Sequence, residues 1–446
     1  MQLFPAFKDT LLGTAWEITE GQRSCEEVLL KCLQQIDQRE ADVQAWVLLD
    51  REGALETAKE RDRELAEGKH RGPLHGIPLG IKDIVDVAGW PTAAGSQLKA
   101  NDIAETDAPV VARLREAGAV ILGKTVTTQF ASFDPPRTRN PWNLDRTPGG
   151  SSSGSAAAVA AGMCLGAVGS QTGGSITRPA AFCGVAGMKP TYGGLPLEGI
   201  VPLSAPMDHP GPLAPTVRDT AVLYAVMAGF SENAGGFPAD WNLICEQTEF
   251  PEPKLGALGG LFQEAADAEM LQTLLHALEH WINGGAFMEP ISLPVEFEKV
   301  PPMHRLIMAR GAANYHRERF AKYPEDYQPA IRGLIEEGLK VSDADWQAAL
   351  EFQKSSRAMI LPLFEEVDVL ISPASVGPAP DRSTTGNPVM NSPWSLCGFP
   401  TLTFPMALSQ DGLPMGVQLI GKPGEELNLY RTALWCEHLV HPENRP

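Results

Sequence analysis

The sequence has no excess of positive charge, no closely spaced cysteine pair and no long apolar run, and each absence excludes a class of protein. Aspartate and glutamate outnumber lysine and arginine by 55 to 36, which gives a formal net charge of −19. This balance argues against nucleic acid held by broad basic surfaces and against docking on anionic membranes. We expect a soluble chain whose surface charges repel one another.

The seven cysteines form no CxxC pair and are odd in number, and several have apolar neighbours in the sequence. The first ten residues, MQLFPAFKDT, lack the basic start and the continuous apolar stretch of a secretory signal. No internal repeat is evident. We therefore expect a cytoplasmic protein whose thiols are reduced and buried.

Charge is also missing from one long internal segment, which runs from Thr147 to Thr177 without a charged side chain. Two Gly-Gly-Ser elements lie near its ends, at residues 149–151 and 173–175. The apolar stretch between them, residues 155–168, is too short and too glycine-interrupted for a transmembrane helix, which needs roughly 20 residues. It is also too apolar for a flexible linker. Glycine pairs let backbone N–H groups approach a ligand, so the segment is typical of an active-site core.

Helices and short apolar strands alternate along the chain, which predicts an α/β fold with a mixed sheet. We expect helices near residues 107–117, 153–162, 303–320 and 344–362, and strands near 119–122, 165–169, 368–372, 400–406 and 415–420. The irregular segment from Pro373 to Pro393 is a candidate for shaping a pocket.

We expect residues 1–446 to form one domain. Its successive parts are N-terminal helices (about 1–65), a core (about 66–230), a weakly patterned variable segment (about 231–300), and helices and strands that return to the sheet (about 301–440).

Two short motifs suggest other functions, but their contexts do not support them. Residues 118–125 fit the phosphate-loop pattern GxxxxGK[ST], yet the expected strand lies inside the motif rather than before it. His276 and His280 share a helix face at a spacing that suits a metal, but no third ligand is evident. We expect neither a nucleotide nor a metal.

Lys82 is a charged residue within the apolar strand predicted at residues 80–84. Burial disfavours the charged form of a lysine and makes the neutral amine a potential base. An ion pair with the adjacent Asp83 is the structural alternative. The residues alone leave both readings open.

Five segments together resemble the amidase signature enzymes, over roughly residues 20–435. They are the block from Gly149 to Gly193 (GGSSSGSAAAVAAGMCLGAVGSQTGGSITRPAAFCGVAGMKPTYG), GIPLGIKD at 76–83, GKT at 123–125, TRNPWN at 138–143, and GFPTLTFPMALSQDGLPMGVQLIG at 398–421. The resemblance implies an α/β/α sandwich with a large mixed β-sheet core covered by helices.

The same resemblance implies a Ser–Ser–Lys triad of Ser175 as nucleophile, Ser151 as bridging serine and Lys82 as general base. It implies a cis peptide bond before Ser151, and an oxyanion hole made by the backbone N–H groups of Thr172, Gly173 and Gly174. The implied reaction is hydrolysis of a carboxylic or urea-derived amide C–N bond through an acyl-enzyme. No metal or organic cofactor is implied.

The sequence departs from the commonest family pattern at three positions. Gln171 stands where an acid is usual, Thr177 where an arginine is usual (Arg178 follows it), and Ser153 where a glycine is usual. We expect an amide at position 171 to support the loop through different hydrogen bonds. Ser152 and Ser153 are expected to fix the loop rather than attack.

The substrate pocket is poorly defined by the sequence. Arg310 lies where some relatives, including allophanate hydrolases, place an arginine that grips a carboxylate; a surface helix arginine is the alternative. Phe130, Phe133, Trp394 and Leu396 are candidates for apolar pocket walls or for plain core. Small acidic or urea-derived amides and larger aryl or acyl amides both remain open.

Two further functions compete with a stand-alone amidase. One is the glutaminase (A) subunit of a tRNA-dependent amidotransferase, which passes ammonia to a partner. The chain is shorter than is typical of such subunits, and its loop from Thr127 to Asn140 differs, so we favour the stand-alone enzyme. A catalytically inactive scaffold is disfavoured because all three triad positions are filled. A homodimer is the default expectation for a soluble enzyme of this size.

Overall fold

Short apolar strands from both halves of the chain assemble into one mixed sheet. A computed structural model describes residues 8–230, 244 and 250–440. Within these residues the 11 strands follow the order β1-β3-β2-β4-β6-β5-β10-β11-β9-β7-β8. The strands are β1 (Trp46–Leu49), β2 (Pro78–Lys82), β3 (Val120–Thr125), β4 (Gly166–Gln171), β5 (Ala186–Lys189), β6 (His209–Ala214), β7 (Lys254–Leu258), β8 (Phe287–Ile291), β9 (Val369–Pro373), β10 (Thr401–Leu408) and β11 (Pro414–Ile420).

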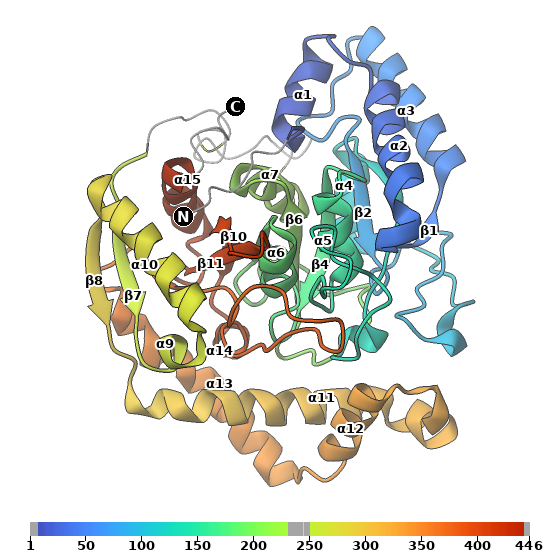
Figure 1. Cartoon of the computed structure of the whole chain (residues 1–446). Helices are drawn as coiled ribbons and strands as arrows, with labels where there is room; N and C mark the ends of the chain where they lie inside the picture. The colour runs from blue at the N-terminus through green and yellow to red at the C-terminus, as the bar shows by residue number, and fades with distance from the viewer. Residues whose placement is uncertain (1–7, 231–243, 245–249, 441–446) are drawn as a thin grey trace.

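Helices cover the sheet, and a group of helices from the second half of the chain lies beyond one end of its strands (Figure 1). The helices are α1 (Leu11–Thr19), α2 (Cys25–Val43), α3 (Arg51–Ala66), α4 (Pro109–Glu116), α5 (Ser153–Ala160), α6 (Thr177–Cys183), α7 (Val217–Met227), α9 (Leu261–Ala265), α10 (Ala268–Asn283), α11 (Val300–Lys322), α12 (Pro329–Gly338), α13 (Asp343–Ile360), α14 (Ser392–Cys397) and α15 (Glu426–Val440).

The helices form layers that confirm the predicted α/β sandwich. Helices α4, α7, α15 and α10 contact one another in that order, while α5 and α6 contact each other and pack on the central strands β4 and β5. Helices α11, α12 and α13 pack together at the lower side of the molecule in Figure 1. The sheet therefore lies between helical layers, with its central strands buried.

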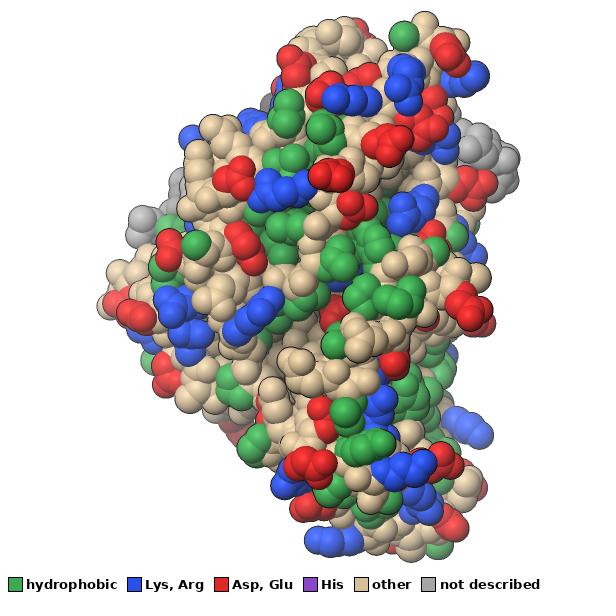
Figure 2. Space-filling view, turned by 90° about the vertical axis from the view of Figure 1, so that its right-hand side faces the viewer, with side chains coloured by type: hydrophobic (Ala, Val, Ile, Leu, Met, Phe, Trp, Pro, Cys, Tyr) green, Lys and Arg blue, Asp and Glu red, His purple; other side chains and the backbone are tan. Residues whose placement is uncertain are grey.

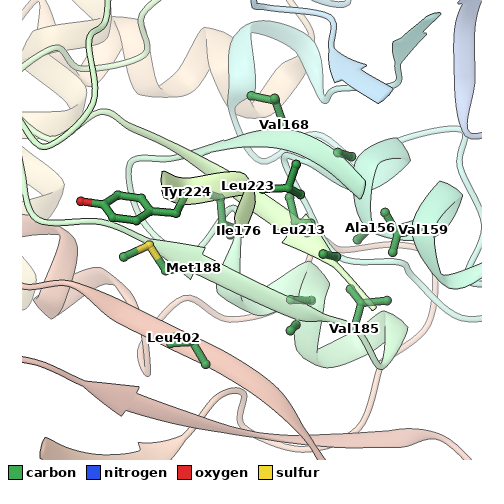
Figure 3. Close-up of a cluster of buried hydrophobic side chains, with 14 of the residues drawn as sticks. Ala156, Val159, Val168, Ile176, Val185, Met188, Leu213, Leu223, Tyr224 and Leu402 are labelled. Carbon is green, nitrogen blue, oxygen red and sulfur yellow. The ribbon is translucent and has the colours of Figure 1, made fainter. Parts of the chain in front are cut away.

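The uncharged segment of the sequence forms the centre of the core. Figure 3 shows Ala156 and Val159 of α5 in one buried cluster with Val168 of β4, Leu213 of β6 and Leu223 of α7. The small residues of α5 permit close packing. A Cβ added at Gly154, for example, would lie 2.2 Å from the carbonyl oxygen of Ala45.

The order of the strands brings the two ends of the uncharged segment next to Lys82. Strand β2 lies between β3 and β4 and runs parallel to both. Lys82 is the last residue of β2 and Gln171 the last of β4, so both lie at the carboxyl ends of neighbouring parallel strands. Ligands bind at such an edge in open α/β sheets.

Two regions differ from their sequence patterns. The GKT of the phosphate-loop-like motif lies inside β3 and not in a loop, as its context indicated. The described part of the weakly patterned segment 231–300 is regular: β7 and β8 extend the sheet at its edge beyond β9, and α9 and α10 lie between these two strands in the sequence. Its strands were missed because both are short and partly exposed.

Candidate active site

Lys82 lies wholly buried at the end of β2, surrounded by hydroxyl groups. Its Nζ atom lies within hydrogen-bond distance of the Oγ atoms of Ser151 at 2.8 Å, Ser170 at 2.8 Å and Ser152 at 3.0 Å. All three hydroxyl groups are neutral. The predicted contact between Lys82 and the bridging serine position is therefore present, and Ser170 is a partner that the sequence analysis missed.

Burial lowers the pKa of Lys82 well below its usual range, and the nearby carboxylate of Asp208 opposes this shift. Asp83, the alternative partner considered from the sequence, instead forms an ion pair with Lys124, with an N–O distance of 3.2 Å. Within the described residues, Lys82 has no carboxylate within salt-bridge distance. The geometry thus favours a neutral amine over an ion pair.

Hydrogen bonds of Ser152 and Ser153, at the start of α5, hold the turn at residues 149–151 in place. The peptide bond between Gly150 and Ser151 is cis, as the resemblance implied. Ser153 Oγ donates to the carbonyl oxygen of Gly149 at 2.8 Å. Ser152 Oγ donates to the carbonyl oxygen of Ser170 and accepts from its N–H, both at 3.2 Å. The prediction that Ser152 and Ser153 fix this loop is confirmed.

Ser175 lies in the turn between β4 and α6, and this turn contacts the other Gly-Gly-Ser turn. The N–H group of Ser152 donates to the carbonyl oxygen of Ser175 at 3.2 Å. Ser175 is buried except for 8% of its surface. Among the hydrogen bonds of the described residues, none is donated by the backbone N–H groups of Gly173 and Gly174. The turn therefore offers free donors beside a partly accessible hydroxyl group.

The side chain of Gln171 holds this turn in place. Its Oε1 atom accepts from the N–H groups of Ile176 at 2.9 Å and Thr177 at 3.0 Å, and from Thr177 Oγ1 at 3.1 Å. Its Nε2 atom donates to Ser395 Oγ at 3.2 Å, and Ser395 Oγ donates in turn to the carbonyl oxygen of Gly173 at 2.8 Å. The expectation that an amide supports the loop with its own set of hydrogen bonds is confirmed.

Asp208 is a second residue that the sequence analysis missed. It is buried and accepts from Thr172 Oγ1 at 2.5 Å, and from the N–H groups of Leu203 and Ser204 at 3.0 Å. Burial raises its pKa, and these donors together with the charge of Lys82 oppose the rise. A single acid directly before an apolar strand was the only sequence signal.

Arg178, which follows the departure at Thr177, is wholly buried. Its Nε atom donates to the carbonyl oxygen of Thr385 at 2.7 Å, and its Nη2 atom donates to that of Gly150 at 2.8 Å. Burial lowers its pKa to about 10. Arg178 thus links Thr385, which lies in the irregular segment 373–393, to Gly150 of the cis peptide bond.

Both terminal nitrogens of Arg310 are hydrogen-bonded to other groups of the chain, while its buried Nε atom has no partner in the described residues. Its Nη1 atom donates to the carbonyl oxygen of Val341 and its Nη2 atom to Asp343 Oδ1, both at 2.5 Å. A substrate carboxylate would have to compete with this ion pair, so the geometry favours the alternative of a surface helix arginine.

The four apolar candidates lie in the hydrophobic core. Phe130, Trp394 and Leu396 are buried, and Phe133 is partly buried and packs against the core. In the described residues, no group of three or more His, Cys, Asp or Glu side chains is arranged to hold a metal ion. None of the described helices has the length and apolar character needed to cross a membrane.

Comparison with known proteins agrees with this geometry. A model of the Amidase family matches residues 27–429. The chain is 36% identical to an amidase of Pseudomonas putida, over 97% of each chain. It is also 35% identical to the A component of the glutamyl-tRNA(Gln) amidotransferase of Carboxydothermus hydrogenoformans, over 94% of this chain and 96% of that one.

Solved structures show the same fold. A crystal structure of an amidase superposes with a TM-score of 0.87 at 31% identity, and the match covers 96% of this chain and 99% of that one. Family model, relatives and structure agree over nearly the whole length. The chain therefore belongs to the amidase signature family.

Proposed function

We propose that the chain is an amidohydrolase in which Ser175 attacks an amide carbonyl and Lys82 acts as the general base through Ser151. The observation that carries the proposal is the buried amine of Lys82, hydrogen-bonded to Ser151 at 2.8 Å and without an ion pair in the described residues. A serine hydroxyl attacks poorly until a base takes its proton. A neutral lysine is a known variant of this base.

The hydrogen-bond pattern around Lys82 supports Ser151 as the relay. The hydrogen of Ser152 is committed to the carbonyl oxygen of Ser170, so Ser152 Oγ is an acceptor for Lys82. A neutral amine has two hydrogens and one lone pair. With Ser152 and Ser170 as acceptors of its two hydrogens, the lone pair faces Ser151, whose hydroxyl then donates to Nζ.

The reaction follows from these positions. Ser175 Oγ attacks the carbonyl carbon while its proton moves to Ser151 Oγ and that of Ser151 moves to Lys82 Nζ. The backbone N–H groups of residues 172–174 stabilise the tetrahedral oxyanion, where each such donor typically contributes about 3–4 kcal/mol. The amine leaves with a proton returned along the relay. Water then hydrolyses the ester to Ser175 and releases the carboxylic acid.

A panel of amides with ammonia detection tests the proposal and narrows the substrate. The panel contains carboxamides and urea-derived amides, each offered to wild type, Ser175→Ala and Ser355→Ala. We expect Ser175→Ala to lose turnover on every substrate that the wild type hydrolyses. Ser355 is an exposed serine on α13, so its alanine variant should behave as wild type. Trapping with hydroxylamine should yield a hydroxamate from the wild-type acyl-enzyme.

Normal turnover by Ser175→Ala would contradict the assignment of the nucleophile. A well-folded Lys82→Met variant should also lack turnover, because no acceptor remains for the proton of Ser151. Normal turnover in that variant would remove Lys82 from the mechanism.

The similarity to the A components of amidotransferases keeps a second function in view, in which the same site releases ammonia for a partner. We favour the stand-alone enzyme. Purification without any co-expressed protein separates the two: turnover of simple amides by the lone chain supports the first. Turnover that appears only with added partner proteins and glutamine supports the second.

A further inference from the structure

A second pocket, which does not include any residue of the proposed triad, lies beside α13. It has a volume of about 580 Å³, within the range of about 300–1,000 Å³ typical of small-molecule sites. We call it the Arg357 pocket; its walls include Tyr192, Pro206, Leu350, Lys354, Arg357 and Leu396. Nothing in the reaction described above uses it.

Hydrogen bonds between three segments of the chain fix the walls of the Arg357 pocket. Gln353 Nε2 on α13 donates to the carbonyl oxygens of Pro206 at 2.9 Å and Leu396 at 3.2 Å. The hydroxyl group of Tyr192 donates to the carbonyl oxygen of Ala205 at 3.1 Å. Because these bonds tie the segments together, the pocket is formed before any ligand binds.

The guanidinium group of Arg357 is held in a fixed position at the wall of this pocket. Its Nε atom donates to the carbonyl oxygen of Cys397 at 3.0 Å. A Cβ added at Gly398 would lie 2.5 Å from Arg357 Nη2, so the glycine leaves room for the guanidinium to lie against the chain. Among the hydrogen bonds of the described residues, Arg357 donates through Nε, and none from its two terminal nitrogens is seen, so their donors are available to a ligand.

The charge of the Arg357 pocket is opposite to that of the whole chain. Lys354 and Arg357 are the charged residues that line it, and no acid lines it. In the part of the chain that the structure describes, neither cation is within salt-bridge distance of a carboxylate. The chain carries a net charge of −19, so a pocket with two uncompensated cations is a local exception.

A buried lysine, Lys189, lies close to the Arg357 pocket. Lys189 is wholly buried and donates to the carbonyl oxygens of Pro190 and Phe399, which lie in the two segments that contribute Tyr192 and Gly398 to the pocket. Burial lowers its pKa to about 7; the charge of Glu426 opposes this shift, and that of Arg357 adds to it. Glu426 accepts from the N–H of Thr191 at 2.9 Å.

The remaining walls are apolar. Tyr192 is 38% exposed, and the partly exposed Pro206 and Leu350 supply aliphatic surface. An arginine fork holds a carboxylate with two parallel hydrogen bonds, while an aromatic ring can pack on such walls. We propose that the Arg357 pocket binds a small carboxylate with an aromatic or aliphatic body, separately from the proposed amide site.

4-Bromobenzoate is a suitable probe, with uncharged 4-bromobenzyl alcohol as its matched control. Calorimetric titration of the wild type should show saturable binding of the carboxylate and at least tenfold weaker binding of the alcohol. Arg357→Gln should weaken carboxylate binding by about tenfold or more, and so should Lys354→Gln, which changes an exposed residue. Arg305→Gln, which removes a cation of α11 paired with Glu337, should leave the affinity unchanged.

The bromine atom locates the bound probe. In a crystal with 4-bromobenzoate, its anomalous signal should lie between Tyr192 and Arg357. A signal found only beside Ser175 would show product-like binding at the amide site and overturn the proposal. Wild-type binding that is absent, or that survives both Arg357→Gln and Lys354→Gln, would overturn it as well, whatever the amide panel shows.

Discussion

Lys82 ends a strand whose residues are all buried, and its neighbours are three serine hydroxyls in place of a counter-ion. Because desolvation penalises the ammonium form, the pKa of Lys82 falls well below the value of a lysine in water. The neutral amine is then available as a base at pH values where an exposed lysine is charged. The rate should fall on the acid side, as Lys82 becomes protonated.

Burial is the main cause of the lowered pKa of Lys82, and the charge of Asp208 opposes it, so Asp208 shifts the position of this acid limb. Asp208 raises the pKa of Lys82, because its carboxylate favours the ammonium form. Asp208→Asn removes that charge, so the pKa of Lys82 should fall further. The acid limb of the kcat/KM profile should therefore move to lower pH.

Asp343→Asn is the matched control, because Asp343 is an exposed carboxylate paired with Arg310. It should leave the profile where it is. A limb that stays in place in Asp208→Asn, or moves to higher pH, would count against a base role for Lys82.

The sequence predicts Lys82, Ser151 and Ser175 as a catalytic group because each lies in a motif of the family, and the structure shows the contact between Lys82 and Ser151. The sequence analysis missed Ser170 and Asp208, which complete the surroundings of Lys82 and of the turn at Thr172. Both are single polar residues in apolar surroundings, and their partners lie far away in the sequence. Only the strand order brings them together.

At the scale of elements, the turn between β4 and α6 requires glycine at position 174 more strictly than at position 173. A Cβ added at Gly174 would lie 2.6 Å from Asn391 Oδ1 and 2.8 Å from Arg178 Nη1. At Gly173 the nearest atom would be His304 Cε1, at an ordinary contact distance of 3.6 Å. The two neighbouring glycines therefore form a natural pair of variant and control.

Gly174→Ala should displace the turn and lower kcat by about 100-fold or more, the scale of losing one oxyanion donor. Gly173→Ala should fold normally and keep most of kcat, because its methyl group has room. Steady-state kinetics on one substrate from the panel gives both values. Equal losses of kcat in the two variants would show that steric fit at Gly174 does not control the turn.

The elements that the sequence predicted well are those with an unambiguous composition. The small residues of α5 and the apolar run of β4 are two examples, each within a few residues of its expected bounds. Strands β7 and β8 were missed because β8 is largely exposed or half-buried, and β7 spans only five residues and begins with an exposed lysine. Helix α12 was also missed; it packs on α11, which lies close to its predicted position.

At the scale of the molecule, the sheet joins the two halves of the chain through β5 and β10, whose strands pair antiparallel. Strands β1 to β6 lie on one side of this seam and β7 to β11 on the other. This continuity supports the expectation of one domain over residues 1–446, which stays a prediction. On the face seen in Figure 2, charged side chains of both signs surround a group of hydrophobic side chains. The expected homodimer stays a prediction.

Leu402 of β10 lies at the seam opposite Met188 of β5, and Figure 3 shows it among the buried side chains there. It is wholly buried. Leu402→Ala removes packing from both halves at once and should cost about 2–5 kcal/mol. For a chain of this size we expect a fall in melting temperature on the order of 2–5 °C.

If the sheet unfolds as one unit, the whole molecule should respond to this change. Far-ultraviolet circular dichroism and tryptophan fluorescence should report one coincident transition, shifted by the same amount in Leu402→Ala. Leu275→Ala, at a position 56% exposed on α10, should melt with the wild type. Two separate transitions, of which only one shifts in Leu402→Ala, would mean that the two halves unfold independently. If the halves unfold cooperatively, loss of packing between β5 and β10 lowers the melting temperature of both.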